Sequence, residues 1–346
     1  MKNHKAPLSL LILLTVLILL TACGGIPETP AGEPAEAAIQ AAFQTVNDQR
    51  LSTLTLDLAQ LPAAAEGQTY VVWVIADDGT ATQVGTAVGG QAFIWASPAG
   101  ENLVGKVVGA RVSVEDAAAA AAGGLAAPSE DWFGGSIPET IRADIRLLVV
   151  SAPDTPANAP YDPSLKDQTL LAYEHAGLAQ DAVNAGDLAG AQNHAEHIIN
   201  ILLGSADAGF GDHNGDGQTQ NPGDGFGVWP YAFKVAEVAD HIAETPGLSN
   251  AHNEAALFMG ACARTISTTG PQAIEQARLL LDTTEVEAGQ LIAQNLVDLL
   301  YAMANGTDAN GNGTIEAVPG ECGAQQIYQL AHRLFDFVLT KSTADQ

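Results

Sequence analysis

The sequence predicts an all-β region followed by an all-α region, and three observations support this prediction. Between residues 48 and 150, apolar and polar residues alternate with the period of two that is typical of half-buried strands. From residue 164 the apolar spacing changes to that of amphipathic helices. The length of 346 residues favours two domains over one. We therefore expect an Ig-like antiparallel β-sandwich followed by an antiparallel helical bundle.

The charge balance excludes one large class of partners. The chain has 13 Lys and Arg residues against 40 Asp and Glu residues, a formal net charge of −27. Binding to nucleic acid needs clustered positive side chains against the phosphates, so nucleic acid is not an expected partner. Apolar residues make up 47 % of the chain, which is enough to form cores and argues against a disordered protein.

Residues 1–22 have the pattern of a secretion signal, because two lysines precede an apolar run over residues 8–20. Residues 20–24 read Leu-Thr-Ala-Cys-Gly and resemble the lipobox of bacterial lipoproteins. This resemblance implies that Cys23 carries a lipid and that the protein is anchored to the extracytoplasmic face of a membrane in the cell envelope. An ordinary cleaved signal or an uncleaved anchor helix is the alternative.

The segments after Cys23 are assigned in chain order. Residues 23–47 begin with many Pro and Gly residues and predict a tether, with a short helix at 36–46. The β-sandwich is expected over residues 48–150, where turn residues separate short apolar runs. The expected strands lie at residues 54–58, 69–76, 91–97, 106–115 and 141–150.

Four motifs follow one another in this β-rich region: Tyr-Val-Val-Trp-Val-Ile at 70–75, Val-Gly-Thr at 84–86, Ala-Arg-Val-Ser-Val-Glu at 110–115 and Gly-Ser-Ile-Pro at 135–138. Their order resembles the extracytoplasmic C-terminal domain of anti-sigma-K-type regulators. The resemblance implies a sandwich that works outside the membrane, with a possible link to envelope sensing. Those regulators hold a sigma factor with a cytoplasmic N-terminal segment. Only residues 1–6 are expected inside here, so we do not expect sigma-factor binding.

The second half of the chain reads as helices. Residues 151–163 are rich in Pro, Ala and Asp and predict a linker, and residues 164–346 predict the bundle. Helices are expected from 164 to a stop at 185–186, and then at 188–203, 231–244, 251–266, 271–281, 286–304 and 324–341.

Two interhelical loops, at 212–224 and 308–321, resemble the calcium loops of EF-hand and dockerin proteins. Oxygen-bearing side chains occupy positions 1, 3 and 5, and glycine occupies position 6, an arrangement that wraps Ca²⁺ in oxygen ligands. Position 12 departs from the pattern, because Gly223 and Pro319 replace the bidentate glutamate. Flexible turns without an ion are the alternative. The expected Ca²⁺ ligands are Asp212, Asn214, Asp216, Gln218, Gln220 and Asp224 in the first loop, and Asp308, Asn310, Asn312, Thr314, Glu316 and Glu321 in the second.

Three histidines form a second candidate metal site. His194 and His197 lie three residues apart on one predicted helix, and His175 lies on the helix before it. Imidazoles in this arrangement suit zinc or copper, whereas ordinary histidines at the edge of a core are the alternative. The chain contains no Cys-x-x-Cys-His motif for attached haem, no His-Glu-x-x-His motif and no nucleophile elbow, so the sequence does not predict an enzyme.

Cys262 and Cys322 are the cysteines left after lipidation, and we expect them to form a disulfide in an exported protein, although two separate buried thiols are the alternative. The sequence thus predicts a lipid-anchored, extracytoplasmic binding or interaction protein with structural Ca²⁺ sites and a partner or ligand that it does not identify. The alternative is a histidine-dependent metalloenzyme or redox protein that uses zinc, copper or haem.

Overall fold

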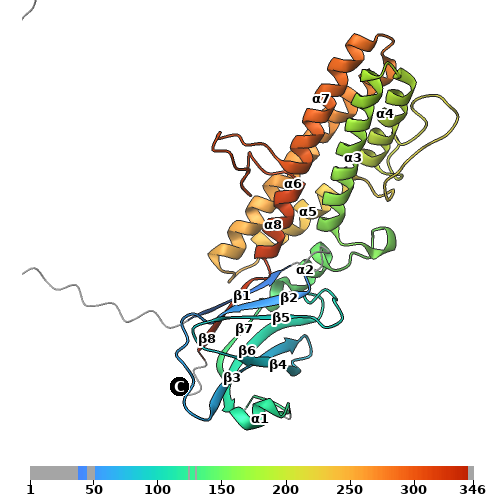
Figure 1. Ribbon diagram of the computed structural model, residues 1–346. Coiled ribbons are helices and arrows are strands. Elements are labelled where there is room, and N and C mark those ends of the chain that lie inside the picture. The colour runs from blue at the N-terminus through green and yellow to red at the C-terminus, as the bar shows by residue number, and fades with distance from the viewer. Residues whose placement is uncertain (1–37, 45–50, 124, 129–130, 342–346) are drawn as a thin grey trace, which may run out of the picture. The chain divides into compact units, whose positions relative to one another are not determined.

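The computed structural model describes residues 38–44, 51–123, 125–128 and 131–341, and the structural statements below concern these residues. The predicted signal, Cys23 and the tether up to residue 37 lie outside them. Within the described part of the chain, no helix is long and apolar enough to cross a membrane. The predicted combination of antiparallel β-structure and helices is confirmed (Figure 1).

Eight strands form one antiparallel sheet in the order β4-β3-β6-β7-β8-β1-β2-β5. The edge strands β4 and β5 approach each other, because a Cβ atom on Gly85 would lie 3.1 Å from the ring of Phe93. The sheet therefore nearly closes into a barrel. Its strands are β1 (Ile39–Gln44), β2 (Thr53–Asp57), β3 (Gln68–Ala76), β4 (Ala81–Ala87), β5 (Ala92–Ala96), β6 (Val107–Asp116), β7 (Asp131–Ser136) and β8 (Phe337–Lys341).

The helices pack mainly against one another. Helix α3 contacts α4 and α7, and α6 contacts α5, α7 and α8 (Figure 1). Small residues such as Ala172, Ala176 and Ala179 lie on the buried face of α3 and permit this close packing. The helices are α1 (Ala117–Ala121), α2 (Arg142–Val149), α3 (Tyr161–Asn184), α4 (Leu188–Leu203), α5 (Val228–Ala243), α6 (Asn250–Asp282), α7 (Val286–Asn305) and α8 (Ala324–Arg333).

Two element predictions in the first half of the chain are wrong. The helix predicted at 36–46 is strand β1, whose residues alternate between buried and more exposed positions and whose neighbours are β2 and β8. The strand predicted at 141–150 is helix α2, preceded by a short 3₁₀ turn at Glu139–Ile141. The apolar residues at 141, 145, 148 and 149 are buried, and their spacing fits a helix face better than a strand.

Two further differences concern the helical half. The helices predicted at 251–266 and 271–281 are one continuous helix, α6, with Pro271 inside it. The helix predicted at 324–341 ends at Arg333, and Phe337–Lys341 forms strand β8 between β7 and β1. The last described residues therefore complete the sheet. The predicted linker contains a 3₁₀ turn at Pro156–Asn158 and the first residues of α3.

Candidate metal centre

A tight turn places the three predicted histidines on facing helices. Helix α3 ends at Asn184, and Gly186 adopts a positive φ of 79° that lets the chain reverse direction. Asp187 then caps α4, because its Oδ1 accepts a 2.9 Å hydrogen bond from the N–H of Gly190. His175 on α3 consequently faces His194 and His197, which lie almost one turn apart on α4.

The ring nitrogens of this histidine cluster (His175, His194 and His197) converge on one point. Nδ1 of His175 lies 3.0 Å from Nδ1 of His194 and 3.2 Å from Nδ1 of His197. One ligand nitrogen from each ring can be chosen so that all three lie within 4.8 Å of one another. Around a tetrahedral Zn²⁺ with Zn–N bonds of about 2.0–2.1 Å, two ligand nitrogens are about 3.3 Å apart. The two separations that involve His175 are close to this spacing.

The surroundings favour the neutral form of two rings in the cluster, those of His175 and His194. His175 is 9 % exposed. Burial, followed by the charges that His197 and His194 would carry, lowers the pKa of His175 to about 4. Burial and the neighbouring His197 also lower the pKa of His194, although Asp187 acts in the opposite direction. Neutral imidazoles keep the lone pairs that a metal ion needs, so at neutral pH these two rings are in the ligating form.

Gln220 contacts the histidine cluster from the first calcium-type loop. Its side-chain Oε1 lies 2.9 Å from Nε2 of His197. Its backbone N–H donates to Oε1 of Glu196 at 2.8 Å, and its carbonyl oxygen accepts from Nδ2 of Asn200 at 2.8 Å. The sequence pattern did not predict the roles of Glu196 and Asn200. The available signal was their spacing of four residues on the helix that carries His194 and His197, which gives α4 one polar face.

The two calcium-type loops share one hydrogen-bonding pattern. In each loop the first residue, Asp212 or Asp308, accepts from the backbone N–H groups three and five residues later, all at 2.8 Å. The third and fifth residues each accept from the N–H group two residues later. These hydrogen bonds hold the backbone of each loop compactly around its acidic and amide side chains. They engage every one of the side chains that the sequence predicts at positions 1, 3 and 5.

A buried glutamate bridges each loop. Glu196 accepts from the N–H groups of His213 and Asn214 at 2.8 and 3.1 Å, in addition to Gln220 at position 9. In the second loop, Glu321 accepts from the N–H group of Asn310 at position 3 and from that of Glu316 at position 9. The two glutamates therefore join equivalent positions, although one comes from the helix before its loop and the other from within its loop.

The remaining predicted ligands lie in different surroundings. Asp224 accepts from the hydroxyl of Tyr231 at 2.7 Å and from the N–H of Phe226, so it faces α5. The carboxylate of Glu316 accepts from the side-chain amides of Asn310 and Asn312. Gln218 and Thr314 contribute backbone N–H groups to their loops.

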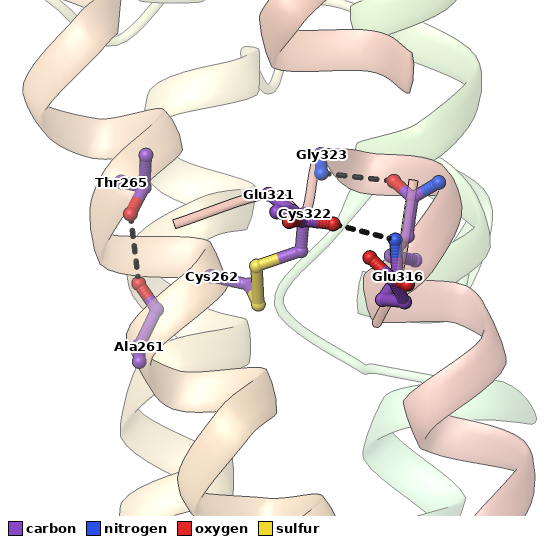
Figure 2. The surroundings of a disulfide bond; sticks show 8 residues. Ala261, Cys262, Thr265, Glu316, Glu321, Cys322 and Gly323 are labelled. Carbon is purple, nitrogen blue, oxygen red and sulfur yellow. Dashed lines mark hydrogen bonds between the residues drawn. A yellow bond between two sulfur atoms is a disulfide. The ribbon is translucent and has the colours of Figure 1, made fainter. Parts of the chain in front are cut away.

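A disulfide fixes the second loop to α6. The predicted pair Cys262 and Cys322 is joined, with Cα atoms 5.7 Å apart (Figure 2). Figure 2 shows Glu321 beside the bond, with its carboxylate directed at the backbone of Glu316. The residue that bridges the second loop is thus the immediate neighbour of the covalent link.

The interpretation of these sites rests on their geometry. The histidine cluster, the bridging glutamates and the disulfide are features of the chain itself and do not depend on a relative. No protein-family model, no curated protein and no solved structure matches the chain.

Proposed function

We propose that the protein binds one transition-metal ion through His175, His194 and His197. The observation that supports this function is the convergence of the three Nδ1 atoms at separations of 3.0 and 3.2 Å. Three imidazoles are a common ligand set for Zn²⁺ and Cu²⁺, and we favour Zn²⁺ because the nitrogen spacing suits a tetrahedral ion.

Three protein ligands leave the fourth position of a tetrahedral ion open to water or to a ligand. This open position distinguishes the histidine cluster from a purely structural zinc site. The open position is also compatible with the alternative function, a metalloenzyme, because a zinc ion lowers the pKa of its bound water to about 7. A partly buried site with a single open position is equally suited to hold a small ligand.

Zinc titration of the full-length protein in detergent tests the proposal. We expect one Zn²⁺ per chain in the wild-type protein and none in His175→Ala, His194→Ala or His197→Ala. His241→Ala is the matched control, because that side chain is 68 % exposed and pairs with Asp144 away from the cluster. An unchanged zinc stoichiometry in the three cluster variants would refute the function.

Weak Ca²⁺ binding by the two loops is a second proposal. It is supported by the shared backbone pattern and by the glutamates Glu196 and Glu321, which bridge positions 3 and 9 in both loops. Position 12 lacks a glutamate in both, so we expect affinities in the weak extracellular range, on the order of 10⁻⁴–10⁻³ M. The ions would be structural, because each would hold together a loop that joins two helices.

We place this activity on a lipid-anchored protein at the extracytoplasmic face of a membrane, which the lipobox around Cys23 supports. The motif order at residues 70–138 supports the anti-sigma-K-like assignment and a role in envelope sensing. We retain the antiparallel bundle as the finer proposal for the helices, because short turns join several of them. For the strands we retain the Ig-like sandwich only as a flattened form of the single, nearly closed antiparallel sheet. Cys23→Ala should abolish acylation, and unchanged detergent partitioning of that variant would refute the anchor.

A further inference from the structure

We propose that Gln220 is a positioning residue of the metal centre, because its side-chain oxygen holds His197 in the tautomer that presents Nδ1 to the metal. This inference rests on the proposed function, since it concerns the same histidine cluster. It assigns the first calcium-type loop a specific task, which is to deliver the Gln220 side chain to His197 and so to set the metal affinity.

The orientation of the Gln220 amide follows from its two neighbours. Its Nε2 lies 3.4 Å from Oδ2 of Asp216, and its Oε1 lies 2.9 Å from Nε2 of His197. An ionised carboxylate only accepts hydrogen bonds, so the amide NH₂ group faces Asp216 and the amide oxygen faces His197.

The orientation of this amide determines where the imidazole proton lies. An amide oxygen only accepts, so Nε2 of His197 must be the protonated nitrogen. Its Nδ1 then carries the lone pair, and this is the atom that lies 3.2 Å from Nδ1 of His175. Hydrogen bonds to the outer nitrogen of a ligating histidine fix both its tautomer and its ring orientation.

The backbone of Gln220 is held where this contact is possible. Glu196 and Asn200, both fully buried, bond its N–H and its carbonyl oxygen. Together with His197, these residues contact Gln220 from one turn of α4. Glu196 also bonds the N–H groups of His213 and Asn214, so the start and the end of the loop are attached to the same carboxylate.

The second loop shows that this arrangement is not a general property of the loop. Its residue at position 9 is Glu316, whose carboxylate bonds the side chains of Asn310 and Asn312 within the loop. In the first loop the side chain at the same position bonds Asp216 within the loop and also contacts His197 on a helix. The side chain at position 9 therefore bonds within the loop in both cases, and only in the first loop does it also contact a histidine.

The test compares zinc affinity in three variants of the full-length protein, measured by competition with a chromophoric chelator. We expect Gln220→Ala to weaken zinc binding about 10–100-fold while keeping one site per chain, the usual effect of removing such an outer partner. Gln220→Glu combined with Asp216→Asn should bind zinc with near wild-type affinity, because a carboxylate oxygen accepts the same proton and the second change removes the like charge beside it. Thr219→Ala, an exposed neighbour, is the control and should bind zinc as the wild type does.

A second readout follows the tautomer directly. Long-range ¹⁵N–¹H spectra of the metal-free protein should show His197 protonated at Nε2, and Gln220→Ala should mix the two tautomers. A predominantly Nδ1-protonated His197 in the wild type overturns the inference even if zinc binds. Wild-type affinity in Gln220→Ala, or equal losses in Gln220→Ala and in Gln220→Glu with Asp216→Asn, also overturns it. In those cases zinc binding that His175→Ala abolishes still supports the proposed function, so the two failures are distinguishable.

Discussion

The two calcium-type loops have the same backbone pattern, but they are attached to the molecule in different ways. Loop 212–224 is held by hydrogen bonds from α4 through Glu196, and its position 9 reaches the histidine cluster. Loop 308–321 is bridged by its own Glu321, next to the disulfide between Cys322 and Cys262. One loop geometry can thus be stabilised by a buried polar network or by a covalent bond. The loop held by the polar network, 212–224, is the one that contacts the histidine cluster.

Removing the disulfide should have the largest effect on stability and should leave the histidine cluster intact. The bond joins residues 60 positions apart, and Cys262→Ala with Cys322→Ala should lower the free energy of unfolding by about 2–4 kcal/mol. Urea unfolding measures this change, and zinc titration of the same variant should give the wild-type affinity. A parallel loss of zinc affinity would show that the two loops are not independently attached.

Replacing the bridging glutamates one at a time should show a second difference between the two loops. Glu196→Gln replaces one acceptor oxygen of a fully buried group that bonds three backbone N–H groups, so we expect a cost of about 1–3 kcal/mol. Glu321→Gln disturbs two such bonds and should cost less. Zinc affinity should fall only in Glu196→Gln. Equal effects of both variants on zinc affinity would contradict the difference between the loops.

Acid should destabilise the folded protein through two histidines, His175 on α3 and His332 on α8. Burial lowers the pKa of His175 near the first loop to about 4, and burial followed by Lys166 does the same for His332 on α8. The folded state then binds fewer protons than the unfolded state, whose histidines titrate near 6.5. This stability is complete above pH 6.5 and is lost as the pH falls towards 4.

Each histidine can be removed separately in the metal-free protein. His175→Gln and His332→Gln should each flatten part of the decline in melting temperature between about pH 6.5 and 4. Added Zn²⁺ should steepen the decline in the wild type and in His332→Gln, because protons compete with the metal for the cluster. If Zn²⁺ still steepened the decline in melting temperature of His175→Gln, the assignment of the zinc site to the histidine cluster would be contradicted.

Calcium should give the smallest effect. An ion that binds only the folded state stabilises it by about 1 kcal/mol when its concentration exceeds the dissociation constant a few-fold. The melting temperature should therefore rise in millimolar Ca²⁺ beyond a control of matched ionic strength. Asp212→Ala and Asp308→Ala should each remove part of the increase, and the double variant should remove all of it. A melting temperature that does not respond to Ca²⁺ would leave both loops as turns stabilised by their own hydrogen bonds.

Local patterns predicted the elements whose buried face is visible in the sequence. The apolar run at 69–76, which ends at a turn, predicted β3, and the cap at Asp187 with the stop at Gly204 predicted the bounds of α4. Strand β1 was mistaken for a helix because its alanines favour helices, and only pairing with β2 and β8 makes the segment extended. Strand β8 was missed for the same reason, since its partners lie hundreds of residues earlier in the chain.

Within the candidate site, spacing was informative only along one element or between adjacent ones. His194 and His197 share a helix, and a short turn brings His175 opposite them, so these three were foreseeable as a group. The contacts of Glu196 and Gln220 depend on how a long loop returns to α4, which no period in the sequence records. The loop motif did predict the side chains that organise each loop, because that pattern is local.

The place of β8 in the sheet also bears on how the chain folds. This strand lies between β7 and β1, so without it the sheet would be divided into β4-β3-β6-β7 and β1-β2-β5. Among the described strands β8 is the last along the chain, and it pairs with β1, which is the first. Such long-range pairing makes folding slow and leaves strand edges open in the meantime. The sheet can therefore close only after the helical region between β7 and β8 has brought these distant segments together.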